Sequence, residues 1–157
     1  MGRELRRVIA SWEHPKKDNG KYYPLLGRSF KEELSEWKKE KKQWDSGLVS
    51  DFNGGWEKKD KEDLKMSFEE YNGEKPIESD YMPEWKEEEK THIQLYENTS
   101  EGTPLSPVFH KDDFELLCQY AEKNATTFAD FKVTKEEWMQ MLKQDLVIVN
   151  VGGLSFI

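Results

Sequence analysis

Few side chains of this chain have both the type and the spacing that chemistry requires. The three histidines, His14, His92 and His110, are far apart and lack the i, i+4 spacing of two metal ligands on one helix. The single cysteine, Cys118, lies on the apolar stripe of an expected helix, where a thiol behaves as a small hydrophobic group. We therefore expect no metal centre and no cysteine nucleophile.

One triplet has the spacing of a known type of catalytic site. Glu88-Glu89-Lys90 matches the Glu-x-Lys of some metal-dependent nucleases, in which a carboxylate holds Mg²⁺ and the lysine positions water. Such triplets are common in a chain where 36% of residues are charged, and the Pro-Asp strand motif that should precede it is missing. A nuclease using Glu84, Glu88 and Lys90 is therefore the least favoured hypothesis. Phosphate-binding glycine patterns and a Gly-x-Ser-x-Gly motif are also missing, so we expect no cofactor and no catalytic residue.

Carboxylates are the most concentrated chemical feature of the sequence. Residues 69–89 hold nine acids against Lys75 and Lys86, whereas residues 1–44 hold 12 basic and 7 acidic residues, a net of +5. Two interpretations stay open: the segments neutralise each other or are simply solvated, or the carboxylates bind a basic partner such as the nucleic-acid groove of a host protein. Direct nucleic-acid binding is disfavoured by the net charge of −8, because such binding depends on neutralising phosphates. The predicted partner-binding residues are Glu69, Glu70, Glu74, Glu78, Asp80, Glu84, Glu87, Glu88 and Glu89.

The composition favours a small folded domain. Aromatic residues make up 13% of the 157 residues and include six tryptophans, whereas disordered chains are poor in aromatic rings. No apolar run reaches the ~18 residues of a membrane span, and the first twelve residues hold no apolar signal-peptide stretch. We expect a protein of the cytoplasm, with no membrane partner; the sequence leaves its oligomeric state open.

Four segments have the pattern of β-strands. Leu5–Trp12 and Lys21–Leu26 are expected to flank a tight turn at Asn19-Gly20, because both turn residues tolerate a positive φ. In Thr91–Tyr96, Ile93 and Leu95 alternate with His92, Gln94 and Tyr96, as in a strand with one buried face. Leu146–Val151 is rich in β-branched residues and predicts a central, covered strand.

Helices are expected at roughly 30–45, 111–124 and 135–144. The first carries an apolar stripe that includes Phe30, Trp37 and Trp44, interpreted as core or, alternatively, as an exposed partner-binding face. Three capping boxes mark where helices begin: Ser29 with Glu32, Ser67 with Glu70, and Thr134 with Glu137.

These elements predict one α+β domain over residues 1–157. Its small, mainly antiparallel sheet is built from the four strands, and the three helices pack on it. Residues 48–85 are dense in charge and contain Asn53-Gly54-Gly55 and two prolines, Pro76 and Pro83. We expect this segment to be an acidic, less ordered insertion with at most a short helix or two.

The connector after the strand at 91–96 is unusually rigid. It reads Gly-Thr-Pro-Leu-Ser-Pro over 102–107, so two X-Pro bonds restrict it, and Gly102 can supply a positive φ. The segment is either a purely architectural crossover or a rigid recognition loop. Its candidate recognition residues are Gly102, Thr103, Pro104, Ser106 and Pro107.

Two stretches carry a resemblance to known sequences. The first is Glu4-Leu5-Arg6-Arg7-Val8 followed by Trp12-Glu13-His14-Pro15, and the second is the block 91–109 with its Gly-Thr-Pro-x-Ser-Pro-Val-Phe ending. Together they resemble a family of small uncharacterised proteins encoded by phages and prophages, mostly of Gram-positive bacteria. The resemblance implies a phage origin and no catalytic residue, and it does not extend to residues 45–80.

The phage origin that the resemblance implies favours a stoichiometric binding role. Small acidic accessory proteins of phages often block or redirect a host protein such as a defence nuclease. We therefore expect an anti-defence inhibitor, of the anti-CRISPR or anti-restriction kind, that acts in the host cytoplasm. The alternative is a non-catalytic morphogenesis or housekeeping protein whose charge merely confers solubility.

Overall fold

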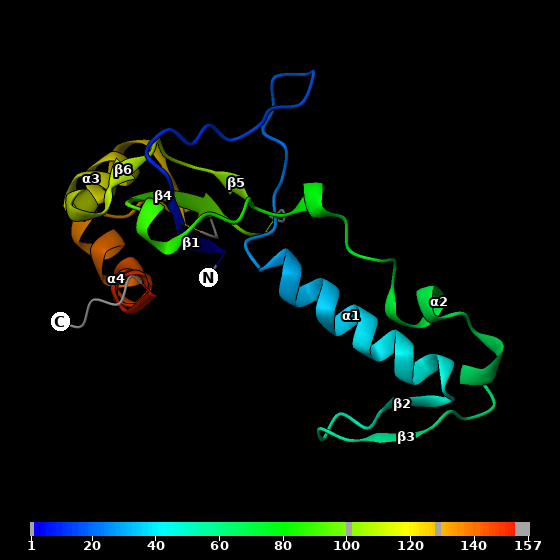
Figure 1. Ribbon diagram of the computed structural model, residues 1–157. Coiled ribbons are helices and arrows are strands. Elements are labelled where there is room, and N and C mark those ends of the chain that lie inside the picture. Colours follow the sequence, from blue (N-terminus) through cyan, green and yellow to red (C-terminus); the bar gives the residue numbers. More distant parts are fainter. Residues whose placement is uncertain (1, 100–101, 128–129, 153–157) are drawn as a thin grey trace. The chain divides into compact units, whose positions relative to one another are not determined.

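The chain folds into two compact units in the computed structural model, which describes residues 2–99, 102–127 and 130–152 (Figure 1). The first unit comprises the residues up to 27 and those from 83 onward, and the second comprises residues 28–82. The described residues form four α-helices and two antiparallel sheets, which confirms the α+β class. The predicted insertion, 48–85, falls across both units.

The sheet of the first unit is organised around β4 (His92–Glu97). Strand β1 (Arg3–Val8) pairs antiparallel with the whole of β4, from Arg3 opposite Glu97 to Val8 opposite His92. On the other edge of β4 lie β5 (Thr103–Pro104) and β6 (Phe109–His110), both antiparallel. The predicted strand at 5–12 is therefore present but lies earlier in the chain.

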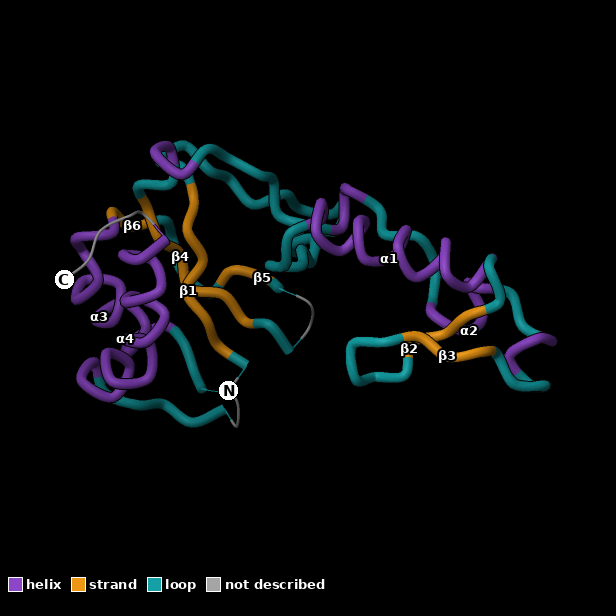
Figure 2. Tube along the Cα trace, turned by 60° about the horizontal axis from the view of Figure 1, so that its bottom comes forward, coloured by secondary structure: helices purple, strands orange, loops and turns teal. Residues whose placement is uncertain are grey.

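Two helices cover one face of this sheet, α3 (Phe114–Asn124) and α4 (Lys135–Gly152) (Figure 2). Leu5, Ile93 and Leu95 point to these helices because cross-strand partners and alternate residues share a face. Together with the helices they form the core of the unit, whose fully buried members are Ile93, Leu95, Leu117, Cys118, Ala121, Trp138 and Leu142.

The opposite face of β4 is also buried, which corrects the prediction of a half-buried strand. Tyr96 is 0% exposed, because the chain after β1 folds back over it with Trp12 and His14. Gln94 is 6% exposed and donates its Nε2–H to Ser106 O in the connector after β4. A central strand with both faces covered can still alternate in polarity when its polar side chains find hydrogen bonds inside the protein.

The predicted strand Leu146–Val151 is wrong, because these residues continue helix α4. The capping box at its start is confirmed: Glu137 N donates to Thr134 Oγ1 and Thr134 N donates to Glu137 Oε1. No proline or glycine follows until Gly152, and Leu146 extends by one more turn the buried stripe of Trp138 and Leu142. The low helix propensity of valine and isoleucine costs only a few tenths of a kcal/mol per residue, which a packed helix overrides.

Asp145 ties α4 to β1, and this contact predicts a specific dependence of stability on pH. Its Oδ2 accepts a hydrogen bond from Leu5 N at 3.1 Å, while burial raises the pKa of the carboxyl above its ordinary value. A raised folded-state pKa means that the stability contribution is present at low pH and is lost as the pH rises through the folded value. Asp145→Asn keeps an acceptor oxygen and loses the charge. We expect it to stabilise the protein at pH 7 by no more than about 1 kcal/mol, since Asp145 is only half-buried, and to flatten the loss above pH ~4 in urea titrations.

The control for this variant is the same pair of titrations below pH ~3, where the two proteins should converge because the wild-type carboxyl is protonated in both the folded and the unfolded state. A variant less stable than the wild type at pH 7 would show that the charge strengthens the hydrogen bond to Leu5 by more than burial costs.

The segment between β1 and the second unit forms no regular strand, so the prediction of a strand at 21–26 is wrong. Lys16 and Tyr22 form an isolated bridge around the predicted turn, in which Gly20 has φ +83° and Lys17 N donates to Lys21 O, and Leu26 is a single bridge residue. After this turn, a hydrogen bond in which Leu25 N donates to Gly102 O holds the backbone in place.

The second unit is built on α1 (Phe30–Asp45), the most regular helix expected from the sequence. Ser29 caps it by accepting a hydrogen bond from Glu32 N, as predicted. A hairpin of β2 (Leu48–Ser50) and β3 (Trp56–Lys58) follows, and then α2 (Phe68–Asn72), which begins at the predicted box of Ser67 and Glu70.

The apolar stripe of α1 packs within this second unit, which corrects the prediction that the helix covers the main sheet. Trp44, Val49 and Phe68 are the buried centre, and the rings of Trp44 and Tyr71 stack with centroids 4.6 Å apart. Trp37 packs edge-on against Phe68 and donates its Nε1–H to Gly73 O. The apolar stripe of α1 therefore belongs to a core, which agrees with the first of the two interpretations drawn from the sequence.

Candidate functional site

The first unit contains a groove of about 710 Å³. The turn that follows β1 contributes Trp12, Glu13, His14 and Lys16, and the connector after β4 contributes residues 104–108. Gln94 and Ser106, both buried, lie in its wall with the exposed ring of Tyr22 and the ring of Tyr120 from α3. The two stretches that the sequence singled out are thus brought together at one surface feature. We call it the β4 groove.

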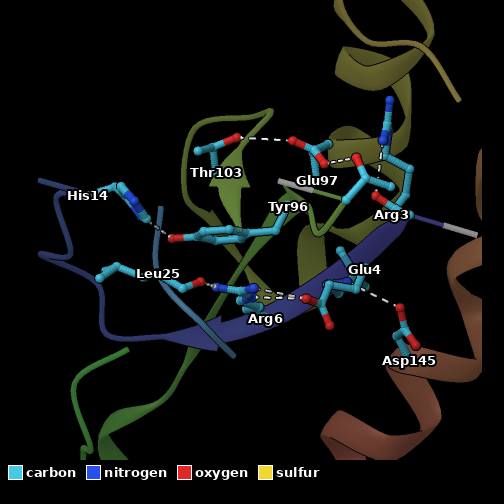
Figure 3. A network of polar contacts seen from close by, with 12 residues as sticks. Arg3, Glu4, Arg6, His14, Leu25, Tyr96, Glu97, Thr103 and Asp145 are labelled. Atoms are coloured by element: carbon cyan, nitrogen blue, oxygen red, sulfur yellow. Dashed lines mark hydrogen bonds and ion pairs between the residues drawn. The ribbon is translucent and has the colours of Figure 1, made fainter. Parts of the chain in front are cut away.

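A chain of neutral hydrogen bonds holds the base of this region around the Tyr96 hydroxyl (Figure 3). The carbonyl of Tyr23 can only accept, so His14 Nε2 carries the proton and Nδ1 accepts from the Tyr96 O–H, at 2.8 Å. The Tyr96 oxygen in turn accepts from Trp12 Nε1–H, at 3.0 Å. Burial lowers the pKa of His14 and raises the pKa of Tyr96 to about 12, so both are neutral at pH 7. Both ring nitrogens of His14 are used in positioning the turn, which sequence inspection did not indicate.

Arg6 lies on the same face of the sheet and fastens a second loop. Its Nη1 donates to Leu25 O at 2.7 Å, and its Nε and Nη2 donate to Glu4 Oε1 (Figure 3). The guanidinium lies 4.3 Å from the centre of the Tyr96 ring. The charge is therefore paired, stacked and nearly inaccessible, as a buried arginine must be.

The candidate recognition loop is largely part of the scaffold. Gly102 has φ +118°, as predicted, and Pro104 pairs with Tyr96 as part of β5. The Ser106 hydroxyl accepts from Leu95 N at 3.0 Å and donates to Pro107 O at 2.8 Å. Only Pro107 of the five is well exposed, and Thr103 is half-buried. The remaining way for this loop to recognise a ligand is through its contribution to the β4 groove.

The nine carboxylates singled out in the sequence are divided between the units. Glu69, Glu70, Glu74, Glu78 and Asp80 belong to the second unit, and Glu84, Glu87, Glu88 and Glu89 to the first. All are exposed except Asp80, which is half-buried. Among the described residues, six of them lack an ion-pair partner: Glu69, Glu70, Glu74, Glu78, Glu88 and Glu89.

Glu70 and Glu87 have structural roles. Glu70 closes the capping box of α2, and Glu87 forms ion pairs with Arg7 and with Lys90, the latter at 2.6 Å. Hydrogen bonds from Lys90 and then Arg7 lower the pKa of Glu87. The pairing of Arg7 with Glu87 is one instance of the self-neutralisation between the basic first segment and the acidic segment. Lys90 forms its ion pair with Glu87 and not with Glu88, the carboxylate of the Glu-x-Lys triplet.

The second unit carries an acidic concavity that the sequence analysis missed. Glu33, Glu36 and Glu40 step by three and four residues along α1 and line a pocket of about 350 Å³ with Glu74. Trp37 and Tyr81 contribute aromatic rings to the same wall, which is completed by Asn72 and Pro76. Spacing of three and then four residues places these three glutamates on one face of the helix, and this pattern could have been recognised in the sequence. A count of net charge hides it, because the same helix also carries lysines. We call this feature the acidic groove.

Phe52 is an exposed aromatic side chain on the hairpin of the second unit. It is 86% exposed, at φ +64°, and its loop is held by Asp51 Oδ1, which accepts from Asn53 N and Gly55 N. A pocket of about 360 Å³ lies beside it, lined by Trp44, Trp56, Phe68 and Tyr71 among others. No apolar periodicity marks Phe52 in the sequence, so only its unusual backbone and exposure reveal it.

The remaining chemistry-bearing residues lie apart. Cys118 is buried in the first core, which raises the pKa of its thiol to about 12. His92 and His110 meet across β4 and β6 with ring centroids 5.1 Å apart, while His14 is held elsewhere by Tyr96. Within residues 2–99, 102–127 and 130–152, no three His, Cys, Asp or Glu side chains are grouped so as to hold a metal ion.

Comparisons with family models, with curated proteins and with solved structures return no match to this chain. In the described part of the chain, every helix is too short or too polar to cross a membrane.

Proposed function

We propose that this chain is a phage-encoded accessory protein that binds a host protein stoichiometrically and inhibits it. The class that fits best is an anti-defence inhibitor of the anti-CRISPR or anti-restriction kind, acting in the cytoplasm of the host bacterium. The phage origin rests on the resemblance of the segments 4–15 and 91–109. The binding role rests on the acidic groove of the second unit.

The acidic groove is the observation that supports this proposal most strongly. Four carboxylates, of Glu33, Glu36, Glu40 and Glu74, surround two aromatic rings in one concave surface. Arginine and lysine side chains of a partner gain there both from the negative potential and from stacking on the rings. Proteins that bind nucleic acid expose such basic side chains in their grooves. The exposed carboxylates at Glu69 and Glu78, which belong to the same unit, add to the negative charge that steers such a partner.

Charge reversal in the acidic groove tests the proposal. Glu36 and Glu74 are exposed and lack an ion-pair partner among the described residues, so Glu36→Lys with Glu74→Lys should leave the fold intact. We expect the affinity for a partner, captured from host lysate and then purified, to fall about tenfold or more, equivalent to roughly 1.4 kcal/mol. The same variant should lose most of the salt dependence of binding, measured as the change of Kd between low and physiological salt.

The matched control is Asp18→Lys with Glu62→Lys, which changes the net charge equally at two exposed positions outside both grooves. Equal losses in both variants would mean that only overall charge matters, and no loss in either would sink the acidic-groove proposal.

A genetic experiment separates this function from the alternative. A phage that lacks an anti-defence gene should grow normally on hosts without the defence system and poorly on hosts that have it. A growth defect on every host would instead identify a morphogenesis or housekeeping protein. Cleavage of nucleic acid that requires Mg²⁺ and is lost on Glu88→Gln would identify the nuclease.

A further inference from the structure

Two concavities of the second unit share part of their walls. The pocket beside Phe52 and the acidic groove are both lined by Glu40 of α1 and Asn72 of α2. The hairpin that carries Phe52 packs beside the C-terminal end of α1 (Figure 1). We call this pocket, which Phe52, Trp56 and Tyr71 help to line, the aromatic pocket. Because the pocket and the groove adjoin at Glu40, one ligand can occupy both.

The aromatic pocket suits a large apolar side chain. Its exposed lining is mainly apolar, whereas the exposed lining of the acidic groove is mainly polar. The ring of Trp44 already contacts Tyr71 and Lys59 Nζ, but Trp56 is half-buried and Phe52 is almost fully exposed. An aromatic ring that enters therefore gains burial and edge-to-face contacts with these side chains. The volume of about 360 Å³ lies near the lower end of the usual range for ligand pockets, about 300–1,000 Å³, as a site for a single side chain requires.

The loop of the hairpin holds the ring of Phe52 in its exposed position. A positive φ, here +64°, is uncommon for a residue other than glycine. Phe52 N donates to Ser50 Oγ, and Asn53 N and Gly55 N both donate to Asp51 Oδ1, so the turn is fixed by three hydrogen bonds. Neither the backbone strain nor the exposure of the ring stabilises the fold, and both are typical of surfaces that bind a partner.

Negative charge surrounds the aromatic pocket as well as the acidic groove. Glu40 is half-buried and has no ion-pair partner in the described part of the chain. Burial raises the pKa of Tyr71, and the carboxylates of Asp63, Glu40 and Glu57 raise it further. A side chain that enters the aromatic pocket therefore binds best when its neighbours in the ligand carry positive charge.

We propose that the second unit binds a peptide segment of its partner in which a large aromatic side chain stands next to basic residues. The aromatic side chain enters the aromatic pocket, and a basic side chain of the same segment passes Glu40 into the acidic groove. This inference rests on the proposed binding of a basic partner and adds the class of residue that accompanies the basic ones. Two different contacts in one segment give specificity, because negative charge alone attracts any cation.

Three capped pentapeptides separate the two contacts. N-acetyl-Lys-Lys-Trp-Lys-Lys-amide has the ring and the charges, its counterpart with alanine in place of tryptophan has only the charges, and N-acetyl-Gly-Gly-Trp-Gly-Gly-amide has only the ring. Lysines on both sides of the tryptophan allow either chain direction. In ¹⁵N-resolved NMR titrations of the full chain, we expect the first peptide to bind about tenfold more tightly than each of the others and to shift the indole N–H of Trp56.

Three variants place the ring of the peptide. Phe52→Ala removes an 86% exposed ring of the aromatic pocket, and we expect the preference for the tryptophan peptide over the alanine peptide to fall to about threefold or less. Trp56→Ala should act in the same way, and Phe52→Ala remains informative if thermal melting shows that Trp56→Ala does not fold. The matched control is Leu64→Ala, which removes an exposed apolar side chain outside both concavities and should preserve the tenfold preference.

Equal binding of the tryptophan and alanine peptides by the wild type overturns this inference and leaves the acidic-groove proposal intact. A preference that survives both Phe52→Ala and Trp56→Ala, or that Leu64→Ala also removes, overturns it as well. Equally tight binding of the glycine peptide would overturn it by identifying a neutral aromatic ligand. If neither lysine peptide binds at millimolar concentration, the acidic-groove proposal fails together with this one.

The variant Glu36→Lys with Glu74→Lys distinguishes the two proposals further. It should weaken both lysine peptides alike and preserve the preference for tryptophan, because it changes the acidic groove and leaves the wall of the aromatic pocket unchanged. Loss of the preference in this variant would show that the ring does not bind in the aromatic pocket.

Discussion

Gly102→Ala is expected to destabilise the first unit by about 2–6 kcal/mol. Two costs add at this position. An alanine at φ +118° is strained by roughly 1–3 kcal/mol, and its Cβ would lie 2.1 Å from Leu25 O and 2.4 Å from Arg6 Nη2. Both contacts are structural, because Gly102 O accepts from Leu25 N and Arg6 Nη1 donates to Leu25 O. Relieving the clash therefore moves the loop that carries Leu25, at a further cost of about 1–3 kcal/mol. Urea unfolding of the purified variant measures the sum.

Gly20→Ala is the matched control, since Gly20 has φ +83° and no atom lies within 4 Å of the position that the added methyl group would take. It should cost only the backbone strain, about 1 kcal/mol. If the two variants lose the same stability, the approach of Leu25 and Arg6 to Gly102 does not matter, and the connector is less constrained than its contacts indicate.

Local signals allowed the helix beginnings to be predicted from sequence. The boxes at Ser67 with Glu70 and Thr134 with Glu137 involve residues three apart, so their hydrogen bonds need no information from the rest of the chain. The strand at 92–97 was predictable for a similar reason, because its apolar residues alternate. What alternation could not tell is whether Gln94 and Tyr96 face water.

The errors arose where distant residues decide the outcome. The β-branched run at Leu146–Val151 favours a strand locally, yet Leu146 continues the helical stripe of Trp138 and Leu142 against the first core. Propensities of a few tenths of a kcal/mol per residue are smaller than the burial of one such side chain, about 1.5–3 kcal/mol. The local residue pattern therefore reported only the β propensity of this segment, which is the weaker effect. The stronger effect, packing of Leu146 against the first core, depends on residues elsewhere in the chain.

Neither groove could be located from sequence, because each is assembled from separate segments. The β4 groove joins residues 12–14, 16, 22, 94, 104–108 and 120. The sequence singled out two of these segments, but the hydrogen bond of Gln94 to Ser106 that joins β4 to the connector follows only from the fold. The acidic groove was closer to being predictable, since Glu33, Glu36 and Glu40 share a helix face.

Trp44→Ala is expected to abolish most of the stability of the second unit. Trp44 is 5% exposed, stacks on Tyr71, and has Lys59 Nζ 3.7 Å from the centre of its ring. Loss of a buried tryptophan costs about 3–5 kcal/mol. A unit of 55 residues has a total stability of only roughly 3–8 kcal/mol at the usual value per residue. Amide hydrogen exchange should therefore accelerate strongly along α1 and the β2–β3 hairpin in this variant.

Leu64→Ala in the same unit is the control, because Leu64 is 67% exposed and its loss should cost less than about 0.5 kcal/mol. The amides of β4 report on the first unit in the same experiment, whose buried cluster contains none of the side chains around Trp44. If exchange at β4 accelerates together with exchange at α1, the two units unfold as one cooperative structure. If it stays slow, the second unit has a core that unfolds independently, and Trp44→Ala removes the acidic groove without unfolding the β4 groove.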